Sequence, residues 1–116
     1  MNDREKRRYQ RIALNLPGVI QFAKGPEVRT QVTEISEGGL KCIFPQSIPL
    51  GASAELRFNL PVAIGKDCLV VGRVQHHHRI NESYQLGIEF TRLSTDVVEA
   101  IRAFIWQTLQ VRKSQD

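Results

Sequence analysis

Basic side chains are concentrated at the start of the chain, where residues 5–11 read Glu-Lys-Arg-Arg-Tyr-Gln-Arg. Arg7 and Arg11 are four residues apart, and Lys6 and Arg8 flank Arg7. Residues 1–12, here called the basic arm, hold five basic and two acidic residues, a net charge of +3 out of +4 for the whole chain. Guanidinium groups pair with phosphate through two hydrogen bonds and also stack on planar rings. The basic arm is therefore a candidate anion-binding segment, although a solvated tail that aids solubility has the same composition.

A second polar segment reads Glu-Ile-Ser-Glu-Gly-Gly over residues 34–39 and follows an apolar run. Glu34 offers carboxylate acceptors and Ser36 a small hydroxyl group. Gly38 and Gly39 leave backbone N–H groups open to a ligand and permit a curled backbone. The same residues would also make an ordinary tight turn between two adjacent strands.

Alternation of apolar and polar residues fills most of the chain and predicts the elements that position these two segments. Six strands are expected, at about residues 13–22, 28–32, 40–44, 54–60, 68–76 and 84–90. Turn residues separate them and no helical period intervenes, which is typical of an antiparallel barrel or sandwich. Gly18, Gly72 and Gly87 fall inside strands, where they favour bulges or tightly curled corners.

The apolar period becomes helical near the end of the chain and predicts a helix at about residues 94–112. Ser94 and Asp96 are good helix N-caps, and Asp96 has capping-box spacing to Glu99. One stripe of the helix is apolar, formed by Val97, Val98, Ile101, Phe104, Ile105 and Leu109. Trp106 lies off this stripe, so it either packs on a neighbouring element or contacts a second chain, which leaves a homodimer open.

Composition and length indicate one packed domain, expected at residues 13–113 after the basic arm. The chain has 116 residues, of which 41% are hydrophobic and 24% charged. Its isoelectric point near 9.4 favours an acidic partner such as a nucleotide, a nucleic acid or an anionic lipid. Cys42 and Cys68 lie in apolar runs and are expected to be buried free thiols. No run is apolar and long enough for a membrane span or a secretory signal, so a cytoplasmic location is expected.

The pair Arg7-x-x-x-Arg11, followed by Glu34-x-Ser36-x-x-Gly39, resembles the two motifs of the PilZ domain family, bacterial receptors for cyclic di-GMP. The motifs of that family are Arg-x-x-x-Arg and Asp/Asn-x-Ser-x-x-Gly, in this order. The strand series, a Gly-x-x-Phe sequence near the end of the last strand and the C-terminal helix extend the resemblance over nearly the whole chain. It implies a mainly β fold, a six-stranded antiparallel β-barrel with a C-terminal α-helix.

The resemblance also implies roles for individual residues. Arg7 and Arg11 would bind the phosphates and the guanine edges or faces of the ligand, Ser36 would contact phosphate or base, and Gly39 would keep the barrel surface open. Glu34 stands where the family has Asp or Asn, so its acceptor oxygens lie one methylene further out. The expected cyclic di-GMP site comprises Lys6, Arg7, Arg8, Arg11, Glu34, Ser36, Gly38 and Gly39.

The expected function is a receptor that binds cyclic di-GMP, changes its surface and signals to a separate effector protein. Four positive charges within residues 6–11 favour an intercalated pair of ligands, because several phosphate charges must be neutralised in one place. No catalytic arrangement is evident, and neither an enzymatic activity nor a cofactor besides the ligand is expected. Two alternatives are a small nucleic-acid-binding β-barrel and a PilZ-like interaction module that no longer binds nucleotide.

Three consecutive histidines at residues 76–78 raise the question of a metal site. In a regular strand only His76 and His78 share a face, and two ligands without a third make a weak zinc site. A polar strand end explains them as well, so no metal is expected.

Overall fold

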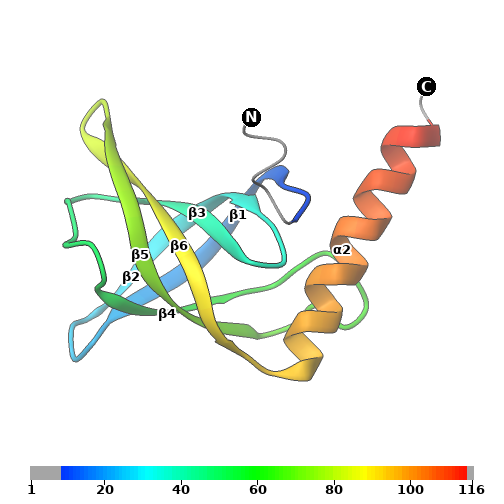
Figure 1. Cartoon of the computed structure of the whole chain (residues 1–116), viewed down its shortest axis with the longest axis horizontal. Coiled ribbons are helices and arrows are strands. Elements are labelled where there is room, and N and C mark those ends of the chain that lie inside the picture. Colours follow the sequence, from blue (N-terminus) through cyan, green and yellow to red (C-terminus); the bar gives the residue numbers. More distant parts are fainter. Residues whose placement is uncertain (1–8, 115–116) are drawn as a thin grey trace.

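The structure, a computed structural model, describes residues 9–114 as a series of strands followed by a helix (Figure 1). The elements are β1 (Ile12–Phe22), β2 (Glu27–Ile35), β3 (Gly39–Phe44), β4 (Ser53–Phe58), β5 (Cys68–Ile80), β6 (Ser83–Leu93) and α2 (Thr95–Ser114). The predicted mainly β fold with a C-terminal helix is confirmed. Within the described residues, no helix is long and apolar enough to cross a membrane.

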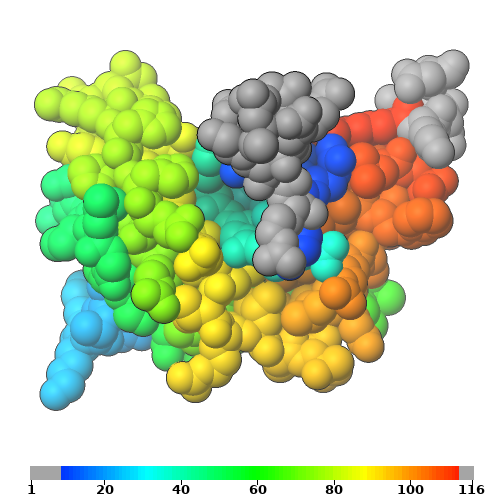
Figure 2. Space-filling view, in the orientation of Figure 1, coloured from blue at the N-terminus to red at the C-terminus, as the bar shows by residue number. Residues whose placement is uncertain are grey.

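The strands form a closed barrel in the order β1-β2-β3-β6-β5-β4, and every neighbouring pair is antiparallel. β1 closes the barrel because it pairs with β2 along one edge and with β4 along the other. β5 and β6 are long, and their hairpin projects at one side of the molecule while α2 lies at the other (Figure 1; Figure 2).

Inward-facing side chains of all six strands fill the barrel, and the apolar face of α2 adds to this core. The helix residues buried there are Val97, Ala100, Ile101, Phe104 and Ile105. Cys42 and Cys68 are buried free thiols, as predicted. Trp106 is 66% exposed, so it does not pack on the barrel.

Some element boundaries differ from those predicted. β1 begins at Ile12, which is fully buried, so the folded domain includes a residue that the sequence assigned to the arm. β5 and β6 continue to the turn at Asn81 and Glu82, where Asn81 has a φ of 55°. The Val97 N–H donates to Ser94 Oγ at 3.2 Å, which makes Ser94 the helix N-cap.

A bulge in β2 changes which face its side chains point to. In β2, Val32 pairs with Cys42 but Glu34 pairs with Lys41, which leaves Thr33 as an extra residue. Val32 is fully buried, so strict alternation would also turn Glu34 inward. The bulge turns Glu34 to the outer surface instead, where it can meet a ligand.

Candidate functional site

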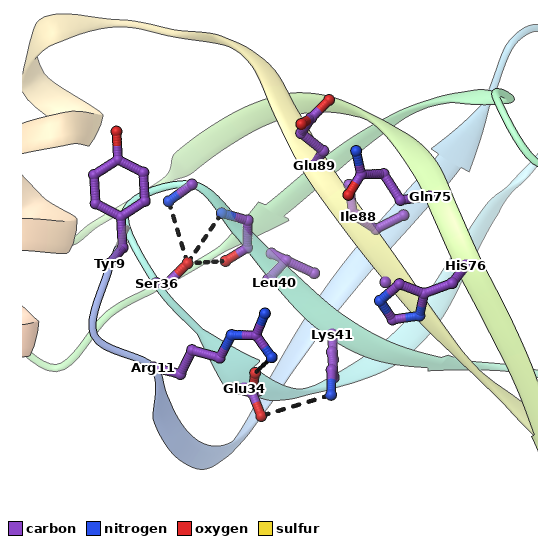
Figure 3. Close-up of a pocket in the computed structure, with 13 residues that line it drawn as sticks. Tyr9, Arg11, Glu34, Ser36, Leu40, Lys41, Gln75, His76, Ile88 and Glu89 are labelled. Atoms are coloured by element: carbon purple, nitrogen blue, oxygen red, sulfur yellow. Dashed lines mark hydrogen bonds and ion pairs between the residues drawn. The ribbon is translucent and has the colours of Figure 1, made fainter. Parts of the chain in front are cut away.

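A cavity of about 460 Å³ lies on the outer surface of the barrel (Figure 3). Its walls come from the residues before β1, the end of β2, the β2–β3 loop, β3, β5 and β6. Five of the predicted site residues line it together, namely Arg11, Glu34, Ser36, Gly38 and Gly39. The other three, Lys6, Arg7 and Arg8, lie outside the described residues, so their predicted roles stay predictions.

Glu34 lies between two cations at one side of the cavity (Figure 3). Its carboxylate is 3.6 Å from Arg11 Nη1 and 3.8 Å from Lys41 Nζ. Arg11 directly precedes β1, and the pairing of Ile12 with Ile35 places it beside the end of β2. At this side of the cavity two cations face one carboxylate, an arrangement that suits an anionic group. Glu89 also lines the cavity, so the described lining as a whole holds two cations and two carboxylates.

Ser36 shapes the β2–β3 loop through its hydroxyl group. Ser36 Oγ accepts the N–H groups of Gly38 and Gly39, each at 3.2 Å, and also lies 3.3 Å from the Gly39 carbonyl oxygen. The Ser36 N–H donates to the same carbonyl oxygen at 2.9 Å. The hydroxyl therefore already has a structural role before any ligand contact.

Gly39 stands where β3 comes very close to β6. A Cβ atom at this position would lie 2.3 Å from the carbonyl oxygen of Ile88, so no larger residue fits without a backbone shift. Gly38 instead faces the ring of Tyr9, whose Cδ2 atom would be 2.9 Å from a Cβ at Gly38. The end of the basic arm thus lies directly on the loop.

Sequence reasoning missed several residues that line the cavity. They include Tyr9, Lys41, Gln75, His76 and Gly87. Lys41 and His76 come from strands on either side of β6, and strand order is not readable from local periodicity. The signal that was available was Gly87, since a glycine inside a strand often marks a close approach by another group.

The histidine cluster supplies one residue, His76, to the lining of the cavity. Within residues 9–114, no group of three or more His, Cys, Asp or Glu side chains is placed to hold a metal ion. His76 lines the cavity, whereas His77 lies on the projecting hairpin against Tyr84, with ring centroids 6.2 Å apart.

Comparison with solved structures shows the same fold in several proteins. The inhibitor of motility MotI/DgrA from Bacillus subtilis is 24% identical with a TM-score of 0.76, over 95% of this chain and 57% of that one. The PilZ domain of YcgR from Escherichia coli, solved with cyclic di-GMP, is 18% identical with a TM-score of 0.70, over 96% and 98%. The K. pneumonia MrkH–cyclic di-GMP complex is 18% identical with a TM-score of 0.74, over 95% and 55%.

The chain spans little more than half the length of MotI/DgrA and MrkH, so those proteins contain segments with no counterpart in it. A comparison with curated protein sequences found no match. The sequence does match the PilZ domain family over residues 5–107, which cover the arm motif, the barrel and most of α2. The chain therefore belongs to the PilZ domain family.

Proposed function

We propose that the protein is a cytoplasmic receptor for cyclic di-GMP that works by binding and not by catalysis. The observation that carries this proposal is the convergence of Arg11, Glu34 and the Ser36 loop on one cavity, with Lys41 as a second cation beside Glu34. Family membership supports it, as do the structures of the YcgR PilZ domain and of MrkH, both of which contain cyclic di-GMP.

The cavity offers a suitable partner for each part of this ligand. Arg11 and Lys41 can pair with phosphate, since charge-assisted hydrogen bonds are stronger than neutral ones. Glu34 supplies acceptor oxygens for the N–H groups of guanine. Because Glu34 pairs with both cations in the structure, ligand phosphate would compete with this carboxylate for them.

Signalling is proposed to follow from closure of the basic arm over the ligand. Ordering a segment on binding couples ligand concentration to the shape of the surrounding surface. The changed surface would then be recognised by a separate effector protein.

Calorimetric titration with cyclic di-GMP tests this function directly. Arg11→Ala should raise the Kd about 10- to 100-fold, the loss expected for one hydrogen bond to a charged group. Arg29→Ala is the matched control, because Arg29 is an exposed arginine of β2 that does not line the cavity. The control should leave the Kd unchanged.

Two outcomes would contradict the proposal. One is no binding of cyclic di-GMP by the unchanged protein, and the other is an equal effect of the two arginine variants. A parallel titration with labelled single-stranded DNA separates this function from the nucleic-acid alternative, since only that alternative requires DNA to bind more tightly than cyclic di-GMP.

A further inference from the structure

A bulge in β5 turns His76 toward the cavity. Val74 pairs with Ile88 and His76 pairs with Gly87, so Gln75 is an extra residue between them. Val74 is 1% exposed, and strict alternation from it would turn His76 into the barrel core. The bulge places His76 on the outer surface instead, where its side chain extends into the cavity (Figure 3).

The imidazole ring of His76 lies flat on the backbone of β6. A Cβ atom at Gly87 would be 2.2 Å from Cε1, 2.3 Å from Nε2 and 2.7 Å from Nδ1 of this ring. Three ring atoms can be this close to one point only if the point lies over the face of the ring, because a point beyond its edge would be much farther from the third atom. One face of the ring therefore covers Gly87, and the side chain is exposed and lines the cavity.

Strand pairing sets the ring in line with the cationic side of the cavity. Gly87 pairs with His76 on one side and with Lys41 on the other, and Lys41 in turn pairs with Glu34. Neighbouring strands are about 4.8 Å apart, so Lys41 and His76 stand roughly 10 Å apart with a residue that has no side chain between them. The row of paired residues Glu34, Lys41, Gly87 and His76 places a flat ring surface next to cations. Such a surface suits a planar base attached to a phosphate.

The surroundings of His76 keep its ring neutral. Partial desolvation lowers the pKa of His76 below its usual value, and three nearby cationic or basic groups lower it further, namely Lys41, His78 and Arg11. Glu34 acts in the opposite direction but does not outweigh them. A neutral aromatic ring that is exposed at a cavity is the kind of surface on which bases of any sequence stack.

We propose that His76 is the platform on which one purine base of the ligand stacks, and that Gly87 is the gap that lets the imidazole lie flat. This inference rests on the proposed function, because it takes cyclic di-GMP as the ligand. The phosphate contacts proposed for the arm would thus be joined by a contact between His76 of β5 and a base. His76 and Gly87 both lie outside the two family motifs.

The test compares four single variants and one double variant of the full chain by calorimetric titration with cyclic di-GMP at pH 7.5. His76→Ala should raise the Kd roughly 5- to 150-fold, the effect of losing one base–aromatic stacking contact. His76→Phe keeps a planar face and should bind nearly as tightly as the unchanged protein. His77→Ala, which removes the neighbouring ring outside the cavity, should have no effect.

Gly87→Ala supplies an independent measure, because its new methyl group must displace the imidazole without changing its chemistry. Gly87→Ala alone should raise the Kd. In the double variant His76→Ala/Gly87→Ala the Kd should be little higher than in His76→Ala, since the two residues act as one unit. Circular dichroism checks that each variant is folded, and the two His76 variants decide the question if Gly87→Ala is not.

The inference is wrong if His76→Ala binds as tightly as the unchanged protein, or if His76→Phe is as damaging as His76→Ala. In either case the unchanged protein still binds cyclic di-GMP, so the proposed function stands. Absence of binding by the unchanged protein would instead overturn the proposed function and this inference together.

Discussion

Arg102 of α2 forms an ion pair with Glu37 in the loop that shapes the ligand site. The Arg102 Nε donates to Glu37 Oε1 at 2.5 Å, and the two residues are 65 positions apart in the sequence. Glu37 lies between Ser36 and Gly38, which both line the cavity. The pair thus joins the C-terminal helix to the site and neutralises a carboxylate close to where ligand phosphate is expected.

We predict that Arg102→Ala raises the Kd for cyclic di-GMP about two- to fivefold, an effect of the size that exposed ion pairs have. The reason is that the unpaired Glu37 carboxylate then repels the phosphates. Thermal unfolding should change little, because the side chain of Arg102 is 65% exposed. Arg112→Ala is the matched control, since Arg112 is an exposed arginine of the same helix.

The double variant Arg102→Ala/Glu37→Gln isolates the electrostatic cause. Removing the charge of Glu37 should restore the affinity that Arg102→Ala lost. A double variant as weak as the single one would show that the pair acts by holding the loop in place and not by neutralising charge.

Cys42 is predicted to be unreactive in the folded protein at ordinary pH. Burial raises its pKa to about 11, and a side-chain hydrogen bond with Thr30 lowers it only in part. Thiolate is the reactive form, so the thiol stays protonated and inert until the pH rises toward 11. A thiol-reactive dye at pH 8 should label both cysteines in denaturant and neither at an appreciable rate in the folded protein. Rapid native labelling of Cys42, located by mass spectrometry, would contradict this.

The number of ligands bound is predicted from the charge of the basic arm. An intercalated pair of cyclic di-GMP molecules carries four phosphate charges, and Lys6 adds to the cations available beside Arg7 and Arg8. We expect two ligands per chain at saturation, and affinity that falls steeply with salt, because exposed charge pairing is screened. Lys6→Leu should reduce the ratio to one, since an apolar side chain would fill the space of the second guanine.

Calorimetry at a known active concentration gives this ratio directly. Arg4→Leu, a change of the same kind farther from the motif, is the control and should leave the ratio at two. A ratio near one for both the unchanged protein and Lys6→Leu would reject the argument.

Local sequence patterns predicted most of the fold and five of the thirteen described residues that line the cavity. Alternation located the strands and the helical period located α2, since both depend on neighbours along the chain. Motif spacing located Arg11, Glu34 and Ser36. Local patterns could not predict that Lys41 and His76 line the cavity. Their positions depend on which strands flank β6, and also on bulges that turn a side chain to the opposite face of the sheet.

Glu34 provides the last prediction, because it departs from the residue type of the family and pairs with the cations that the ligand needs. Its carboxylate is 3.6 Å from Arg11 and 3.8 Å from Lys41. Glu34→Asp shortens the side chain by one methylene and withdraws the carboxylate from both cations. We expect an unchanged or lower Kd for cyclic di-GMP, and a loss of unfolding free energy below about 1 kcal/mol, as for other exposed ion pairs.

Glu27→Asp is the matched control for this change, because Glu27 is an exposed residue at the other end of β2 and does not line the cavity. Titration of the two variants and the unchanged protein under one set of conditions compares them directly. If the cations are the limiting contacts, freeing them helps the ligand and only Glu34→Asp changes the Kd. A large loss of affinity in Glu34→Asp would contradict the prediction, because it would show that only the longer side chain of Glu34 can reach the guanine N–H groups and that its contact with the ligand outweighs the freeing of Arg11 and Lys41.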